Sequence, residues 1–405
     1  MHILLFAHNA YTEINSGAAR SLRLMMEWLA ESGMTCTALG SGRFDQSRDT
    51  DIAELNNRIA AADNAVVERD ATSGVIPVAR FRLRGVDVIS VETRGNHRTE
   101  DPRGLYQIYG LFKSFLEQTP PDIVLSYSGG SLVQAGLQLA RHHGIQTIFT
   151  LRALGYDDRA LFAHADRVLL NSQMMIEYYG RMIGLQNSAY LPSPMNWREV
   201  LSDDDDARSF VTFINPSPHK GIVFFARLAE VLARFRPDIP ILVVQSGGSA
   251  EPLANTPGLD LARHPQILVS PPIADQRQIY ALTKILLVPS VFEEPFGRVA
   301  AEAMINGIPP IVSDRGGLPE TVGDGGIVLT LPDWITPTEH RIPSPAEVKP
   351  WFDAIVRLWT NKAEYDRAAS AAKQAAIRLY DERMLKQRYL DYFTAKGPFP
   401  PLFAD

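Results

Sequence analysis

Residues 288–304 read VPSVFEEPFGRVAAEAM, and this segment combines the end of an apolar strand, a turn and the start of a helix. Pro295 is suited to a place at or near the first position of a helix, and Gly297 allows another group to approach the backbone closely. The free amide groups in the first turn of a helix favour an anion. The segment therefore predicts a strand–turn–helix unit whose turn can hold a phosphate.

The same segment carries two carboxylates, Glu294 and Glu302, eight residues apart. On one continuous helix they would lie within about 80° of each other and about 12 Å apart along the axis. An extended ligand with a phosphate in its middle could then touch both carboxylates and the helix start. The alternative is that Glu294 caps the helix and Glu302 is merely exposed.

Short apolar runs alternate with helical patterns on both sides of this segment, which predicts parallel β-α-β units with helices on both faces of a sheet. The alternation pauses at residues 202–207, SDDDDA, and we place a domain boundary near 196–208. The Asp-x-Asp pattern within this run is one that some enzymes use to bind a metal, but we interpret the run as a solvated linker. A long helical region follows from about 346 to 393, with breaks near Asn361 and Tyr380. The expected strands are residues 1–7, 86–91, 122–125, 146–151, 167–170, 210–214, 241–245, 267–269, 285–288, 310–312 and 327–329.

Length and composition exclude several classes of protein. The 405 residues, 45% hydrophobic and 21% charged, predict two or three globular domains. A net charge of −6 argues against a broad nucleic-acid-binding face. Cys36 is the one cysteine, so neither an internal disulfide nor a thiolate zinc cluster is available. No stretch approaches the roughly 18 apolar residues of a membrane span, and we expect a cytoplasmic enzyme.

Three further glycine-bearing turns are compatible with a diphosphate ligand. Residues 215–221, NPSPHKG, contain Lys220, which can neutralise a phosphate, and Gly221, which keeps the approach clear. The alternative is a solvated turn lysine. Residues 313–320, SDRGGLPE, and residues 15–19, NSGAA, also place glycines between a strand and a helix. None of these turns is a dinucleotide fingerprint or a P-loop.

Taken together, these motifs carry a family resemblance. The segment from Glu294 to Glu302 resembles the E-x7-E motif of retaining GT-B glycosyltransferases of family four, relatives of the glycogen and sucrose synthases. Residues 313–320 look like the "GG-x-P-E" turn of that family, and Ser16-Gly17 looks like its N-terminal glycine loop. The pairs 289–290, Pro-Ser, and 220–221, Lys-Gly, also match. The resemblance implies an α/β fold of two facing, doubly wound, Rossmann-like domains with a cleft between them.

The resemblance also implies which domain binds which substrate. Residues 1–200, with a C-terminal helix at about 380–405, would bind the acceptor, and residues 208–380 would bind a nucleotide-sugar donor, UDP- or GDP-linked. Glu294 would position the sugar, Lys220 would stabilise the leaving diphosphate and Glu302 would hold the ribose. It implies no cofactor and no metal. The other implied donor-binding residues are Gly17, Asn215, Val269, Ser270, Phe296, Gly297, Arg298 and Val299.

The chain departs from the family pattern at two places. Asn215 stands where the family usually has an arginine, so Arg298 or His219 would have to supply the missing cation. The family often has a histidine near the C6 hydroxyl of the sugar, where residues 149–152 read FTLR and Arg152 would take its place.

The acceptor side is predicted from fewer residues. Arg94, His97, Arg98 and Arg103 lie together in the loop after the strand at 86–91, and this basic loop favours an anionic acceptor, such as a phospholipid-linked or carboxylated one. The candidate acceptor-binding residues are Arg94, Arg98 and Arg152. The alternative for Arg94 and Arg98 is a solvated surface loop. Peripheral contact with a membrane is compatible with a lipid-linked acceptor.

Three other functions are compatible with the same motifs. A nucleotide-sugar epimerase or a glycoside phosphorylase could use the same two domains. A non-catalytic subunit that binds a nucleotide sugar would be consistent with Asn215 in place of the family arginine.

Overall fold

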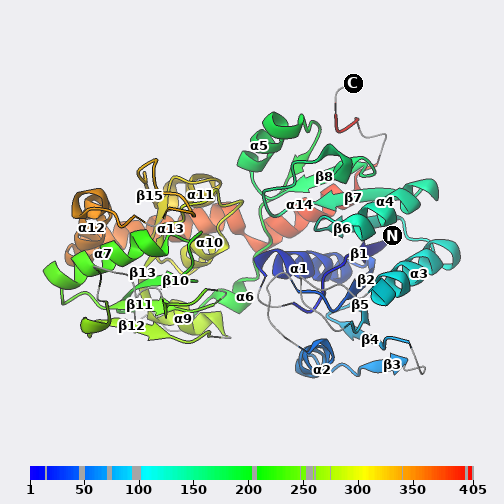
Figure 1. The fold of residues 1–405 in the computed structure, drawn as a ribbon, viewed down its shortest axis with the longest axis horizontal. Helices are drawn as coiled ribbons and strands as arrows, with labels where there is room; N and C mark the ends of the chain where they lie inside the picture. The colour runs from blue at the N-terminus through cyan, green and yellow to red at the C-terminus, as the bar shows by residue number, and fades with distance from the viewer. Residues whose placement is uncertain are drawn as a thin grey trace. The chain divides into compact units, whose positions relative to one another are not determined.

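The computed structural model describes residues 1–13, 16–44, 51–70, 75–93, 102–202, 208–246, 248–251, 259, 261–273, 275–339, 341–396 and 400–403. The chain forms two compact units (Figure 1). Unit 1 comprises Met1–Pro194 and Leu385–Asp405, and unit 2 comprises Met195–Met384. The acidic run at 203–207, with its Asp-x-Asp pattern, lies outside the described residues, as do Arg94 and Arg98.

The described strands of unit 1 form one sheet in the order β3-β4-β5-β2-β1-β6-β7-β8-β9. All neighbours pair in parallel except β3 with β4 and β4 with β5, which are antiparallel. The strands are β1 (His2–Phe6), β2 (Thr35–Ser41), β3 (Glu68–Asp70), β4 (Val78–Leu83), β5 (Val86–Val91), β6 (Ile123–Tyr127), β7 (Gln146–Thr150), β8 (Arg167–Leu170) and β9 (Ala189–Tyr190).

The hairpin of β4 and β5 departs from the parallel pattern predicted from the sequence. Arg84 and Gly85 connect the two strands with φ angles of 45° and 86°. Two successive positive φ angles are the signature of a tight two-residue hairpin turn. Such a turn leaves no room for the crossover that parallel strands need, so β4 adds to the sheet in the antiparallel direction.

Helices cover both faces of the unit 1 sheet. On one face, α3 (Pro102–Gln118), α4 (Ser131–His142) and α5 (Gln173–Ile183) contribute to one buried apolar cluster. α1 (Gly17–Glu31) and α14 (Glu382–Thr394) pack together through Trp28 and Tyr389, whose ring centroids are 5.9 Å apart. α2 (Ile52–Ala62) packs beside β4. Because α14 follows unit 2 in the sequence, the chain returns to unit 1 at its end.

Unit 2 contains a parallel sheet in the order β12-β11-β10-β13-β14-β15. Its strands are β10 (Phe210–Ile214), β11 (Ile241–Val244), β12 (Ile267–Ser270), β13 (Thr283–Val288), β14 (Pro310–Ser313) and β15 (Ile327–Leu329). Its helices are α6 (Trp197–Val200), α7 (Ile222–Phe235), α9 (Gln276–Leu282), α10 (Arg298–Ile305), α11 (Leu318–Val322), α12 (Pro345–Thr360) and α13 (Lys362–Tyr380). Packing between α7 and α12 includes Phe224 edge-on to Trp351, with centroids 5.4 Å apart. The sequence-based α/β prediction is confirmed for both units.

The last three helices end and begin where the sequence predicts breaks. Asn361 follows α12 and caps α13, and its side chain accepts a hydrogen bond from the N–H of Glu364. A capping box between Ser344 and Glu347 starts α12.

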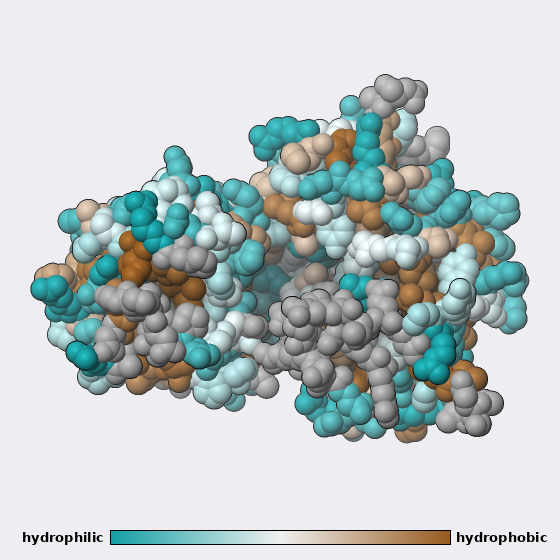
Figure 2. All heavy atoms as spheres, in the orientation of Figure 1, coloured by the Kyte–Doolittle hydropathy of each residue, from teal (hydrophilic) through white to brown (hydrophobic). Residues whose placement is uncertain are grey.

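Hydrophilic residues cover much of the visible surface, with apolar residues in patches between them (Figure 2). No helix among the described residues is long and apolar enough to cross a membrane.

Candidate functional site

Two helices of unit 2 start side by side at the carboxyl edge of its sheet. β10 leads through a turn into α7, which begins after Gly221, and β13 leads through residues 289–297 into α10, which begins after Gly297. β10 and β13 are parallel neighbours, so both turns lie at the same edge. Ligands of open α/β sheets bind at this edge, and helix N-termini favour anions there.

Gly221 allows the two turns to touch. Its φ is 80°, and a Cβ at this position would lie 1.9 Å from the backbone oxygen of Pro289. The N–H of Val291 donates to the backbone oxygen of His219 at 3.0 Å. The turn after β10 is therefore held against the turn after β13, at a position where only glycine fits.

Lys220 and Glu294 form an ion pair between these turns. The Ser290 hydroxyl donates to the same carboxylate oxygen, Oε1, at 2.6 Å. The Glu294 side chain is 6% exposed and the Lys220 side chain 26%, so the ammonium lies nearer the solvent than the carboxylate. Since an ammonium has three N–H donors, Lys220 can hold Glu294 and still donate to an incoming phosphate oxygen.

The turn after β14 fixes the backbone of Glu294. Gly316 has a φ of 62°, and a Cβ there would lie 2.4 Å from the backbone nitrogen and oxygen of Glu294. The N–H of Gly317 donates to the Glu294 backbone oxygen at 2.6 Å. The Ser313 hydroxyl donates to the backbone oxygen of Ser290 at 2.7 Å. Residues 313–317 thus support Glu294 from a third strand.

Glu302 lies on α10 with only 1% of its surface exposed. The Tyr280 hydroxyl donates to its Oε2 at 2.7 Å, and Nη2 of Arg298 donates to its Oε1 at 3.1 Å. Burial contradicts the alternative that Glu302 is an exposed side chain. Each carboxylate oxygen has two lone pairs, so each still has capacity for a ligand hydroxyl.

The helix starts later than the sequence predicts. α10 begins at Arg298, with Gly297 as the N-cap in a left-handed conformation and no side-chain cap. Pro295 therefore lies in the turn rather than at the first helical position, and Glu294 neither caps the helix nor lies on it. The helical angle and spacing expected for Glu294 and Glu302 do not apply. The physical reason is that Gly297, at φ 88°, interrupts the right-handed helix before it reaches Pro295.

The other predicted donor-binding residues of unit 2 differ in their burial and contacts. Asn215 has a φ of 64°, and its Oδ1 accepts from the N–H of Gly248 at 2.7 Å, so it joins the turns after β10 and β11. Phe296 is buried and lies edge-on to Tyr380 at 5.7 Å, and Val299 is half-buried in the first turn of α10. Val269 is 49% exposed on β12. Ser270, the last residue of that strand, accepts a backbone hydrogen bond from Gln245 at 3.0 Å.

Arg298 and His219, the two candidates to supply the cation that Asn215 lacks, each contact other side chains. Arg298 is bound to Glu302, as described above. The His219 ring lies edge-on to Phe292, with centroids 5.5 Å apart, and the Lys220 ammonium lies 5.1 Å from the centroid of the same ring. His219 and Lys220 thus share one aromatic neighbour.

Gly17 and Arg152 belong to unit 1. Gly17 is exposed as the first residue of α1, and the Ser16 side chain caps this helix by accepting from the N–H of Ala19 at 3.3 Å. Arg152 follows β7, and its guanidinium donates to the Ser193 hydroxyl at 3.4 Å and the Tyr389 hydroxyl at 3.5 Å.

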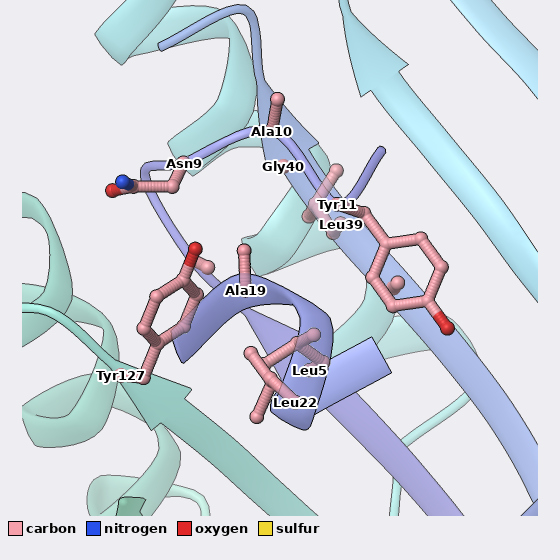
Figure 3. Close-up of a pocket in the computed structure, with 11 residues that line it drawn as sticks. Leu5, Asn9, Ala10, Tyr11, Ala19, Leu22, Leu39, Gly40 and Tyr127 are labelled. Atoms are coloured by element: carbon pink, nitrogen blue, oxygen red, sulfur yellow. The ribbon is translucent and has the colours of Figure 1, made fainter. Parts of the chain in front are cut away.

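A small pocket that the sequence does not indicate lies beside α1, at the carboxyl ends of β1, β2 and β6. In Figure 3 the rings of Tyr127 and Tyr11 lie on either side of Ala19. Gly40 is required in its wall, because a Cβ there would lie 2.6 Å from the backbone oxygen of Asn9. The lining residues are Leu5, Ala7, Asn9, Ala10, Tyr11, Ala19, Leu22, Ala38, Leu39, Gly40 and Tyr127.

The structure thus brings Lys220 and Glu294 together near the start of α10, and Glu302 lies buried on that helix. Sequence reasoning missed Tyr280, and it placed Ser290 and Ser313 in the motifs without assigning a contact to their hydroxyls, because a tyrosine or serine near a strand end carries no signal of its partner. Among the described residues, no group of three or more His, Cys, Asp or Glu side chains could hold a metal ion.

Two family models match the chain in succession. Residues 16–195 match the glycosyl transferase 4-like domain, and residues 196–374 match the glycosyl transferases group 1 model.

A curated relative is the D-inositol 3-phosphate glycosyltransferase of Mycobacteroides abscessus, which is 33% identical over 176 residues. The match covers 42% of this chain and 35% of the relative. The chain thus spans about a third of the length of that protein.

Solved structures resemble nearly the whole chain. The sucrose-phosphate synthase of Thermosynechococcus elongatus has a TM-score of 0.67 at 18% identity, with 98% of this chain and 100% of that chain covered. The Anabaena protein HepE, in complex with UDP-glucose, has a TM-score of 0.67 at 15% identity, with 97% and 99% covered. With a GT-B fold and family matches that run from residue 16 to residue 374, the chain belongs to the GT4 family of glycosyltransferases.

Proposed function

We propose that this glycosyltransferase moves a sugar from a nucleoside-diphosphate sugar to an acceptor hydroxyl with retention at the anomeric carbon. The observation that carries the proposal is the position of Lys220 at the edge where α7 and α10 start. A cation and two helix N-termini at one edge favour a diphosphate more than any neutral ligand.

In the proposed reaction, the bond between the anomeric carbon and the diphosphate oxygen breaks, and negative charge develops on the leaving diphosphate. Lys220 and the backbone amides of residues 296–299 would stabilise that charge, because they are held in place before the reaction. The acceptor oxygen forms the new bond on the same face of the sugar, and its proton passes to the leaving phosphate. We assign no protein nucleophile.

The carboxylates would position the rest of the donor. Glu294, held by Lys220 and Ser290, would accept hydrogen bonds from sugar hydroxyls. Glu302, held by Tyr280 and Arg298, would accept from the two ribose hydroxyls with its remaining lone pairs. We propose Val269 and Ser270 as neighbours of the base, Phe296, Gly297, Arg298 and Val299 as backbone contacts of the diphosphate, Asn215 as a support of the turn, and Gly17 as a phosphate contact from unit 1.

The donor would be UDP- or GDP-linked, and no cofactor or metal would be required. A complex of the structurally similar HepE with UDP-glucose supports the choice of a nucleoside-diphosphate sugar. The acceptor, a sugar or a lipid-linked sugar, would bind to unit 1.

The test begins with the unfolding temperature in the presence of UDP, GDP, ADP and their sugars. A nucleotide at about 100 times its Kd stabilises the folded protein by about 2.7 kcal/mol, which is visible as a raised midpoint. Failure of every nucleoside diphosphate to raise the midpoint would contradict the proposal. NMR of the transfer product then reports whether the anomeric configuration is retained.

Two variants test the roles of the carboxylates. Glu302→Ala should weaken nucleotide binding, whereas Glu294→Ala should mainly lower turnover. Glu230→Ala on α7 is the matched control, because this partly buried carboxylate pairs with Arg227 within one helix and touches none of the site residues named above. If Glu302→Ala and Glu294→Ala both kept full transfer activity, the site assignment would be wrong. Incubation of the donor without acceptor separates transfer from epimerisation, because only an epimerase changes the sugar of the donor.

A further inference from the structure

A second group of polar side chains lies in unit 1, where β7 and β8 end. Thr150 is the last residue of β7, Arg152 follows two residues later, and Asn171 follows the last residue of β8. The two strands are parallel neighbours, with Thr150 paired to Leu169. Their carboxyl ends therefore place the three side chains at one edge of the sheet.

The alternation of side chains along the strands directs this group to one face. Phe149, Leu151 and Leu170 belong to the apolar cluster beneath α3, α4 and α5. Because successive side chains of a strand point to opposite faces, Thr150 and Asn171 point away from that cluster. This is the side on which Tyr389 of α14 contacts Arg152.

The Ser193 hydroxyl links Arg152 with Asn171. Nη1 of Arg152 donates to the Ser193 hydroxyl oxygen at 3.4 Å, and Nδ2 of Asn171 donates to the same oxygen at 3.3 Å. Tyr389 is held in turn, because its hydroxyl donates to the backbone oxygen of Pro192 at 2.8 Å. Ser193 therefore positions the side chains of Arg152 and Asn171, and Tyr389 positions that of Arg152.

Three buried polar atoms of this group have no hydrogen-bond partner among the described residues: Oγ1 of Thr150, Nε of Arg152 and Oδ1 of Asn171. Thr150 is 1% exposed and Asn171 is 4% exposed. Buried polar atoms in native proteins nearly always have a partner. Three such atoms on neighbouring strand ends indicate a position that a polar ligand completes.

The charge of Arg152 indicates what kind of ligand this is. The two hydrogen bonds of its guanidinium go to neutral hydroxyls and are long, and no carboxylate of the described residues pairs with it. Arg69 of the same unit shows the contrast, because Glu92 accepts from its Nε at 2.9 Å. A partly buried guanidinium without a carboxylate partner favours an incoming carboxylate or phosphate, to which it can donate two parallel hydrogen bonds.

We propose that Thr150, Arg152 and Asn171 form a binding site for a sugar-like substrate that carries an anionic oxygen group. The carboxylate or phosphate of the substrate binds Arg152, a neighbouring hydroxyl donates to Oδ1 of Asn171, and the Thr150 hydroxyl completes the contact. This inference deepens the proposed function, on which it rests for the role of the ligand as acceptor: it gives the acceptor a negative charge.

The experiment uses the full chain labelled with ¹⁵N and follows the Nε–H signal of Arg152, assigned with Arg152→Lys. The probes are D-glucuronate, D-glucose 6-phosphate and neutral D-glucose, at equal concentrations and constant ionic strength. We expect at least one of the two anionic sugars to shift the signal with an affinity about 10-fold or more above that of glucose. The comparison of the two anions distinguishes a carboxylate from a phosphate.

Variants test each member of the group. Arg152→Met should abolish the preference for the anionic sugar over glucose, and calorimetry measures the two affinities. Asn171→Asp, which adds a negative charge at nearly unchanged size, should weaken binding about 10-fold or more. Thr150→Val preserves the shape of the side chain and should weaken binding less. Arg82→Met is the matched control, because the Arg82 side chain is 70% exposed in the same unit, and it should leave binding unchanged.

The inference is overturned if neither anionic sugar shifts the Arg152 signal, since ordered water would then complete the site. It is also overturned if glucose shifts the signal equally, since the site would then have no preference for an anion. Its failure is distinguishable from failure of the proposed function. Nucleoside diphosphate binding, assigned to unit 2, should persist in Arg152→Met. If the unaltered protein bound no nucleoside diphosphate, that result would contradict the proposed donor site and not the site at Arg152.

Discussion

At the scale of single residues, the carboxylate of Glu302 depends on neighbours that are distant in the sequence. Tyr280, 22 residues earlier, donates to one oxygen, and Arg298, one helical turn earlier, donates to the other. These two contacts fix the plane of a buried carboxylate. Its remaining lone pairs then point in set directions, which is the condition for recognising two neighbouring hydroxyls.

Removing the Tyr280 hydroxyl tests this support. Tyr280→Phe should raise the Kd for the nucleoside diphosphate about 10-fold, because a hydrogen bond to a charged group contributes about 1.5–3 kcal/mol, and should change kcat less. Calorimetry measures the Kd. Tyr365→Phe in the same unit is the control, since that hydroxyl donates to the backbone oxygen of Lys284. An unchanged Kd in Tyr280→Phe would show that Glu302 does not need this donor.

Cys36 provides a prediction about pH. The thiol is 1% exposed, and its burial, together with the charge of Asp87, raises its pKa from 9.0 to about 12. A raised pKa means that the folded protein favours the protonated thiol. The stability it contributes is present below pH 9 and is lost as the pH rises toward 12.

The measurement is the reaction of Cys36 with a disulfide reagent at pH 8. Because the thiolate is the reactive form, we expect no reaction in the folded protein and full reaction after unfolding in guanidinium chloride. Rapid modification of the folded protein would show that the thiol is accessible and ionised.

At the scale of elements, the turns after β10, β13 and β14 share one construction. Each places glycine where another group approaches closely: a backbone at Gly221 and Gly316, and the Leu318 side chain at Gly297. The sequence predicts these three turns, because a strand end followed by glycine and a helix is visible in the residue pattern. It does not predict that α10 starts at Arg298, because that depends on the φ of Gly297.

Gly221→Ala tests the contact between two of these turns. The added Cβ would lie 1.9 Å from a backbone oxygen, at a φ of 80°. We expect a loss of about 2–4 kcal/mol in the free energy of unfolding, measured with urea. Gly307→Ala is the matched control in the same unit, because its φ is 66° and its nearest atom would lie at 3.6 Å.

The control should cost only about 1–2 kcal/mol, the strain of a left-handed alanine. Equal losses in the two variants would show that the turns after β10 and β13 separate without cost. The difference between them therefore measures the close contact rather than the backbone angle.

At the scale of the whole molecule, the end of the chain belongs to the unit in which it began. α14 buries Leu385, Tyr389 and Phe393 in unit 1, although these three residues follow the whole of unit 2, Met195–Met384. Tyr389 contacts Trp28 of α1 and donates to Pro192. Unit 1 is therefore complete only once α14 has been synthesised.

Tyr389→Ala should destabilise unit 1 by about 3–5 kcal/mol, the range for truncating a large buried aromatic side chain. Hydrogen–deuterium exchange should become faster in peptides from residues 1–194 and stay unchanged in peptides from 208–380. Gln387→Ala, an exposed position on the same helix, is the control. Faster exchange in both units would show that they unfold as one.

The sequence by itself determined the class of fold, most strand positions and the glycine-bearing turns of unit 2, because these depend on local periodicity and on glycine. It also carried the family motifs. Tertiary structure decided which side chains meet: Lys220 with Glu294, Tyr280 with Glu302, and Arg152 with Ser193 and Tyr389. These pairs are separated by 22 to 237 residues, and only the folded sheet and the returning helix bring them within hydrogen-bond distance.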